Sequence, residues 1–137
     1  MEIRICIDVE DLGKALRFYV EGLGLRVGRR FDEKWVELLG ASAPIDLLVK
    51  AQGSPAAIEP SALRDYRRHW TPLHLDFAVA DIEAAIRRAE TFGAKLEGSI
   101  REEAYGRLAL MADPFGHGFC FLEFQHGGYD RLPQKSG

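Results

Sequence analysis

Two stretches of the chain alternate apolar and polar residues, which is typical of a β-strand with one buried face. The first stretch covers 3–9 and the second covers 73–79. Each is followed by an aspartate, Asp11 or Asp81, that can cap the first turn of a helix. Apolar residues then recur at positions i, i+3, i+4 and i+7 and give each predicted helix one buried stripe. The stripes consist of Leu12, Ala15, Leu16 and Tyr19, and of Ile82, Ala85, Ile86 and Ala89.

Each predicted helix is followed by three short runs that are typical of strands. We expect the helices to stop at Gly22 and Gly93. The runs cover about 25–30, 34–39 and 45–50 in the first half, and about 95–101, 106–112 and 118–124 in the second. Both halves therefore predict the same order of elements, βαβββ.

The two halves also match when the chain is compared with itself at an offset of 70 residues, which aligns Asp11 with Asp81. Segments 9–17 and 79–87 then share the capping aspartate, the apolar stripe and an arginine. We infer a duplicated unit that keeps its framework residues and varies the strand positions facing a cleft. The positions that differ are Arg4 against His74, and Cys6 against Asp76.

A chain of 137 residues has the usual size of one domain. We expect module one at 1–52, a linker at 53–71, module two at 72–126 and an irregular tail at 127–137. The linker is rich in Ala, Pro, Ser and Gly. Its length predicts a spacer or a lid with a short helix around 61–69.

The overall composition narrows the classes of function. A net charge of −3 disfavours nucleic acid as a partner, because phosphate binding needs a clustered positive surface. The apolar runs are far shorter than the roughly 20 residues of a membrane span, and the N-terminal residues alternate instead of forming a signal peptide. We therefore expect a cytoplasmic protein, with no membrane partner, whose two cysteines, Cys6 and Cys120, are reduced thiols.

Three phrases carry a family resemblance: DLGKALRFY at 11–19, GLGL at 22–25 and DPFGHGFC at 113–120. Together with the paired modules, they resemble the vicinal oxygen chelate family, which includes glyoxalase I, bleomycin-resistance proteins and extradiol dioxygenases. The resemblance implies an α+β fold in which two tandem βαβββ modules each curl a sheet into half of an open barrel around a ligand cleft. It also implies a homodimer, in which both chains can complete the cleft.

The metal-dependent members of that family hold an ion at four strand positions with His, Gln and Glu side chains. The resemblance places Arg4, Asp46, His74 and Cys120 at those positions. Arg4 has no lone pair to donate and repels a cation, and a lone thiol suits hard metals poorly. We therefore expect no metal and no other cofactor. One alternative stays open, a zinc ion held by Asp46, His74 and Cys120.

Without a metal, the same strand positions predict other chemistry. Arg4 either forms an internal ion pair with Asp46 or offers its guanidinium to a substrate carboxylate or phosphate. His74 and Asp76 lie on one strand face, so the carboxylate can orient the imidazole as a general base. We therefore predict His74 and Asp76 as catalytic residues.

Aromatic residues border the predicted cleft and favour a flat ligand. His69 and Trp70, at the end of the linker, can cover such a ligand by stacking. The predicted ligand-binding residues are Arg4, Cys6, Asp46, Leu48, His69, Trp70, Tyr105, Cys120 and Phe124. The sequence thus predicts a metal-independent protein that binds or converts an anionic or aromatic small molecule. The alternative is a metal-dependent lyase, isomerase or dioxygenase.

Overall fold

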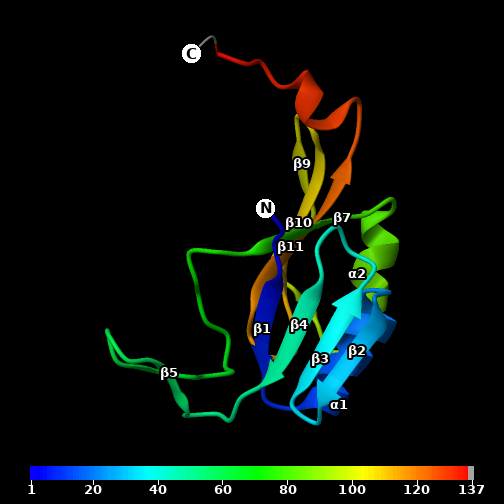
Figure 1. Ribbon diagram of the computed structural model, residues 1–137. Coiled ribbons are helices and arrows are strands. Elements are labelled where there is room, and N and C mark those ends of the chain that lie inside the picture. The colour runs from blue at the N-terminus through cyan, green and yellow to red at the C-terminus, as the bar shows by residue number, and fades with distance from the viewer. Residues whose placement is uncertain (136–137) are drawn as a thin grey trace.

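Two β-sheets and two helices make up most of the structure (Figure 1), a computed structural model that describes residues 1–135. The first half consists of β1 (Ile5–Val9), α1 (Leu12–Leu16), the π-helix η1 (Arg17–Gly22), β2 (Arg26–Asp32), β3 (Trp35–Leu39) and β4 (Ile45–Val49). The linker contains β5 (Pro55–Ala57) and β6 (Ala62–Leu63). The second half consists of β7 (Leu75–Ala78), α2 (Ile82–Thr91), β8 (Lys95–Leu96), β9 (Arg101–Glu103), β10 (Gly106–Ala112), β11 (Gly118–Phe124) and the 3-10 helix η2 (Gly128–Arg131).

The sheets of the two halves have equivalent strand orders. The first sheet is ordered β1-β4-β3-β2, and the second is ordered β7-β11-β10-β8, with β9 also paired to β10. In each, the first and last strands of the module are parallel neighbours, β1 with β4 and β7 with β11. No strand ladder joins these two sheets within residues 1–135, so they do not close into a barrel. The prediction of two tandem βαβββ modules in an α+β fold is confirmed.

Both main helices begin where the sequence predicts. The side chain of Asp11 accepts a hydrogen bond from the amide of Lys14, and the side chain of Asp81 accepts one from the amide of Ala84. These bonds satisfy amides of the first turn that have no partner within the helix. At the other end of α2, Gly93 takes the left-handed conformation (φ 101°) that commonly ends a helix.

The first helix changes character along its length. After α1 the chain widens into η1, in which the amide of Leu23 bonds to the carbonyl of Phe18 five residues earlier. Gly22 is the last residue of η1, and Gly24 takes the left-handed conformation (φ 81°) just beyond it. None of the helices within the described residues is long and apolar enough to cross a bilayer.

One contiguous apolar core joins the two modules. It contains the inner faces of both sheets and the stripes of both helices. Helix α2 packs against η1, and Figure 1 shows α1 and α2 on the same flank of the molecule. The predicted stripe residues that are buried are Ala15, Tyr19, Ile82, Ile86 and Ala89, and the half-buried ones are Leu12, Leu16 and Ala85. Phe18 is fully buried although the stripe did not include it.

Polar bonds between the modules reinforce this shared core. The hydroxyl of Tyr19 donates to the buried carboxylate of Asp113 at 2.6 Å. Burial, and then the charge of Asp113, raises the pKa of Tyr19 well above its usual value, so Tyr19 remains a donor. His117 Nε2 lies 2.7 Å from the carbonyl oxygen of Asp8 and ties the last turn of the second sheet to β1.

The strands depart from the predicted limits in three places. β1 and β7 start at Ile5 and Leu75, where their pairing with β4 and β11 starts. Ile3 and Leu73, predicted to be buried, lie before those ladders and are exposed. The predicted strand at 95–101 is split into β8 and β9, because Gly98 between them takes a left-handed conformation (φ 83°).

The helix predicted around 61–69 is wrong, since the linker forms the hairpin of β5 and β6 instead. The amide of Arg64 bonds to the carbonyl of Ser54, and the amide of Tyr66 bonds to the side chain of Gln52. The backbone groups are therefore satisfied across the linker and not along a helix. The tail, predicted to be irregular, contains η2, and its last two positions, 136–137, lie outside the described residues.

Candidate functional site

Each of the two large sheets has one face that points away from the helices, and we refer to it as the open face. Side chains of paired residues on adjacent strands point to the same side. In the second sheet, one such row on the open face consists of Asp76, Cys120 and Leu110. The next row consists of Ala78, Leu122 and Leu108.

The open face of the second sheet is mostly apolar. Leu108, Cys120 and Leu122 form a buried cluster, with Tyr105 packed against it. The apolar strip continues to the tip of the sheet through Phe124, whose ring centroid lies 6.5 Å from that of Tyr105. This face therefore suits a ligand that buries apolar surface.

The open face of the first sheet is charged. Arg4 donates from Nε and Nη2 to the carboxylate of Asp46, at 2.9 Å in both cases, and from Nη2 to Glu37 at 2.7 Å. The indole of Trp35 donates to Asp46 at 3.2 Å, and the guanidinium of Arg29 lies 3.2 Å from Glu37. Both carboxylates are buried, and Arg4 partly covers them.

These contacts commit the guanidinium of Arg4 to internal partners. Its hydrogen bonds lower the pKa of Glu37 and the pKa of Asp46, so both carboxylates stay ionised at neutral pH. The hydrogen bonds that Arg4 donates to Asp46 and then to Glu37 in turn raise the pKa of Arg4. Of the two roles that the sequence leaves open for Arg4, this geometry favours the internal ion pair.

His74, Asp76 and Cys120 come together on the open face of the second sheet. His74 Nε2 lies 3.1 Å from Asp76 Oδ1, and potential metal-binding atoms of the three residues lie within 4.8 Å of one another. Burial, and then Asp76, raises the pKa of the Cys120 thiol to about 11. Cys120 is therefore a neutral thiol at pH 7 and not a resting nucleophile.

Within one chain, Asp76 and not Asp46 accompanies His74 and Cys120. Asp46 lies on the first sheet, where Arg4 holds it. Both modules nevertheless carry a cysteine beside an aspartate across their parallel strands. The pairs are Cys6 with Asp46 and Cys120 with Asp76, so the two residue types have exchanged strands between the modules.

A pocket of about 260 Å³ opens beside the His74, Asp76 and Cys120 cluster, between the end of the linker and strands β10 and β11. Its lining includes four predicted site residues, which are His69, Trp70, His74 and Cys120. The other lining residues are Arg68, Thr71, Leu73, Glu97, Leu110, Met111, Gly118 and Phe119. Trp70 and Leu73 are 81% and 83% exposed and form an apolar rim. None of the lining residues belongs to the first sheet, so one chain forms this pocket from the second module and the linker alone.

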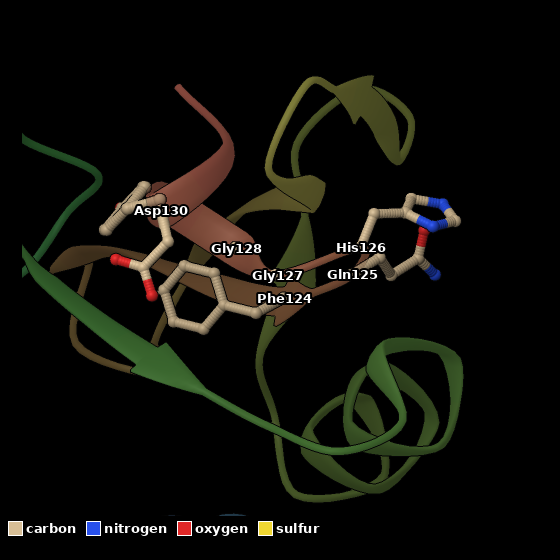
Figure 2. A pocket seen from close by; sticks show the side chains of 7 residues that line it. Phe124, Gln125, His126, Gly127, Gly128 and Asp130 are labelled. Carbon is tan, nitrogen blue, oxygen red and sulfur yellow. The ribbon is translucent and has the colours of Figure 1, made fainter. Parts of the chain in front are cut away.

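A wider hollow of about 470 Å³ lies at the tip of the second sheet and is lined by 124–130. Figure 2 shows the side chains of Phe124 and Asp130 on one side of this segment and those of Gln125 and His126 on the other. Because the polar groups diverge, they do not form a set that can orient a ligand. Phe124 lines this hollow and Tyr105 packs near it, and neither of these two predicted residues lines the pocket beside Cys120.

Two residues of the site region are absent from the predicted set. Glu37 shares the open face of the first sheet with Trp35, and the alternation in 34–39 is the signal that points to it. His117 hydrogen bonds to His69, 48 residues away, and no local pattern pairs them. The remaining predicted residues, both on the open face of the first sheet, are Cys6, which is exposed, and Leu48, which is half-buried.

Two tandem βαβββ modules with these open faces define a protein of the vicinal oxygen chelate fold. FosX, a fosfomycin resistance protein from Listeria monocytogenes, has this fold at a TM-score of 0.70 and 18% identity, over 96% of this chain and 98% of FosX. TnmS3, an antibiotic binding protein from Streptomyces sp. CB03234, matches at a TM-score of 0.62 and 20% identity, over 91% of this chain and 96% of TnmS3. Residues 4–122 match the glyoxalase-like domain model, and the chain belongs to that family.

A relative at the level of sequence is the anthracycline biosynthesis protein DauV from Streptomyces sp. strain C5. The two are 30% identical over 122 residues. The match covers 85% of this chain but 38% of DauV, so the chain spans less than half the length of that relative.

The four positions that the family resemblance assigns to a metal, Arg4, Asp46, His74 and Cys120, do not fit a hard divalent cation. Arg4 places a positive charge at the first position and already binds Asp46, which occupies the second. Cys120, at the fourth, is a thiol that burial keeps protonated. Asp46 and His74 are usual ligand types for such an ion, but both carboxylate oxygens of Asp46 already accept hydrogen bonds from Arg4.

The ion pairs on the first sheet predict how stability depends on pH. In the folded protein, the pKa values of Glu37 and Asp46 lie below their ordinary 4.5 and 3.8. Their contribution to the free energy of unfolding is therefore fully present above these ordinary values. It is lost as the pH falls through the lowered values. We therefore expect Arg4→Met to lower the free energy of unfolding at pH 7, and the deficit to shrink below about pH 4.

Urea unfolding across that pH range measures this difference. Arg26→Met, at an exposed arginine on β2 of the same sheet, is the matched control and is expected to change stability by less than about 0.5 kcal/mol. If Arg4→Met were as stable as the wild type at pH 7, Arg4 would not be holding the two carboxylates.

Proposed function

We propose that the chain binds a planar aromatic molecule that places part of its ring system in the pocket beside Trp70, on the open face of the second sheet. The observation that carries this proposal is the exposed rim of Trp70 and Leu73 next to an apolar sheet face. Large exposed apolar side chains around a concave site are typical of ligand binding. The volume of about 260 Å³ lies below the usual lower limit for small-molecule pockets, about 300 Å³, so the pocket encloses only part of a polycyclic ligand.

An aromatic ligand is favoured over an anionic one by the charges on the two sheets. Arg4, the cation predicted to bind an anion, has its hydrogen bonds directed to Asp46 and Glu37. In the pocket, Arg68 pairs with Glu97 at 2.8 Å, so its charge is also balanced. His74 and Asp76 remain as the polar groups that can orient a hydroxyl or carbonyl on the ligand. If the bound compound is converted, His74 is the residue we propose for proton transfer.

The names of two similar proteins agree with this proposal. DauV is named for the biosynthesis of anthracyclines, which are planar polycyclic compounds, and TnmS3 is named as an antibiotic binding protein. Neither likeness identifies the ligand of this chain, since the structural match is at low identity and DauV is the longer protein. They support the choice of polycyclic aromatic compounds as the first ligands to test.

Doxorubicin, an anthracycline, is a suitable probe for this site. We expect it to raise the melting temperature of the wild-type protein and to bind by isothermal titration calorimetry. Trp70→Ala is expected to weaken binding about ten-fold, since an aromatic stacking partner contributes about 1.4 kcal/mol.

Trp35→Phe provides the matched control, because Trp35 lies on the first sheet and does not line the pocket. It is expected to leave the Kd unchanged. Equal weakening by both substitutions, or no binding of doxorubicin to the wild type, would contradict the proposed site.

Zinc binding by His74, Asp76 and Cys120 is a second candidate function. Nitrogen, oxygen and sulfur donors within 4.8 Å of one another suit zinc, with a fourth position left for water or a ligand. The pKa of about 11 for Cys120 sets a condition, because zinc must displace the thiol proton before sulfur can bind.

Elemental analysis after incubation with zinc and desalting tests the second candidate. The candidate predicts about one zinc per chain, loss of that zinc in His74→Ala and its retention in His126→Ala. Release of one proton from Cys120 also predicts an affinity that rises about ten-fold per pH unit near neutrality. Zinc that stays bound in His74→Ala would exclude this cluster as the site.

We further propose that the protein forms a homodimer. Within residues 1–135, β1 and β7 each lie at the end of their sheet with one edge unpaired. An unpaired edge is a template for pairing with a second copy. Sedimentation equilibrium is expected to give twice the chain mass of 15.3 kDa, and a mass of one chain at micromolar concentration would contradict the dimer.

A further inference from the structure

Two histidines from distant parts of the chain hydrogen bond to each other beside the pocket. His117 Nδ1 lies 2.9 Å from His69 Nε2. The outer nitrogens of both rings face backbone carbonyls. His117 Nε2 lies 2.7 Å from the oxygen of Asp8, and His69 Nδ1 lies 2.9 Å from the oxygen of Arg67. The two imidazoles therefore bridge two carbonyl groups through three contacts.

The number of protons in these three contacts can be counted. A carbonyl oxygen only accepts, so each outer contact needs a proton on the ring nitrogen, His117 Nε2 or His69 Nδ1. A neutral imidazole carries one N–H, so the two outer contacts use both protons of a neutral pair. The central contact would then set two lone pairs against each other at 2.9 Å. A third proton turns that contact into a hydrogen bond and gives the pair one positive charge.

The charged groups around the pair have partners of their own. These partnerships are Asp8 with Arg64, Asp65 with Arg67, Arg68 with Glu97, Asp113 with Tyr19, and Lys14 over the ring of Phe115. The aromatic rings of Tyr66 and Phe115 flank His117. Within the described residues no carboxylate bonds to either imidazole. No neighbouring charged side chain within residues 1–135 therefore takes part in the central contact.

His69 belongs to a strap, residues 67–70, that crosses the turn at 113–118. The amide of His69 donates to the carbonyl of Gly116 at 3.2 Å. The strap lies so close to this turn that a Cβ on Gly116 would collide with the carbonyl of Arg67. The strap ends in Trp70, at the rim of the pocket. The histidine pair thus ties the pocket rim to the last turn of the second sheet and to β1.

We infer that His69 and His117 form a proton-dependent latch on the pocket rim. The latch is complete while the pair holds three protons. When the third proton leaves at higher pH, one of the three contacts loses its hydrogen bond and the strap loosens. A fourth proton, taken up at lower pH, sets N–H against N–H and breaks the central bond. The latch is closed only over an intermediate range of pH, in which the pair holds three protons.

The latch also regulates ligand binding, a consequence that rests on the proposed function. A ligand stacked on Trp70 is held most tightly while the strap is fastened. The latch itself requires no ligand, because all its bonds lie within the chain.

Nitrogen-15 NMR of the imidazole rings counts the protons directly. Spectra of the wild-type protein between about pH 5 and about pH 9 report which ring nitrogens of His69 and His117 carry a proton. The inference predicts a range in which three of the four nitrogens are protonated, between states with two and with four. A direct change from two to four protonated ring nitrogens, with no range of three, would overturn the inference.

Hydrogen exchange of the His69 amide measures the fastening of the strap. Its protection factor, which corrects for the intrinsic pH dependence of exchange, is expected to fall about five-fold on leaving the three-proton range. The amide of Arg64, bonded to Ser54, is the internal control and should not change. A three-proton range with constant protection of His69 would overturn the latch.

His117→Ala is expected to remove the pH dependence of the protection factor of the His69 amide. The matched control is His126→Ala, at an exposed histidine near the tip of the second sheet, and it is expected to retain that pH dependence. Persistence of that pH dependence in His117→Ala would overturn the latch. If His117→Ala does not fold, the wild-type measurements decide. Because none of these experiments uses a ligand, a failed latch leaves the aromatic site standing, and failed doxorubicin binding leaves the latch standing.

Discussion

The arrangement of the two modules depends on the buried carboxylate of Asp113. It accepts hydrogen bonds from the hydroxyl of Tyr19 at 2.6 Å and from the amides of Phe115 and His117 at 2.8 and 2.9 Å. Three donors replace the water that a buried carboxylate gives up, which makes the burial tolerable. The bond from Tyr19 fixes η1 against the turn between β10 and β11. The other two shape that turn, so that His117 reaches β1 and the linker. The relative position of the sheets and the place of the pocket rim follow from this buried acceptor.

On that common framework, the two open faces have diverged into different kinds of surface. The first face is a closed network in which Arg4 satisfies Glu37 and Asp46, and a ligand there would have to replace bonds to buried charges. On the second face, each Å² of apolar area that a ligand buries contributes about 25 cal/mol to binding. Its rim residue Trp70 is exposed and available for such contact. This difference in cost is the reason that we place the ligand on the second sheet.

The parts of the structure that the sequence predicts are those with local signals. Asp11 and Asp81 cap helices because the spacing to the first turn is fixed within the chain, and the apolar alternation sets the strands. Contacts over long separations were less predictable. The sequence leaves two roles open for Arg4, and its ion pair with Asp46 is one of them. The part of Glu37 in that ion-pair network is not predictable, because it depends on which strands become neighbours. The helix predicted in the linker is wrong for the same reason. The backbone hydrogen bonds of the linker run across a hairpin, which the spacing of apolar residues does not reveal.

Chemical-shift mapping of the labelled wild-type protein during a titration with doxorubicin tests most directly whether a planar aromatic ligand binds on the open face of the second sheet, as we propose. The largest shifts are expected on Trp70, Leu110 and Cys120, which line one pocket. Shifts concentrated on Arg4 and Trp35, or no shifts at saturating doxorubicin, would contradict the proposal.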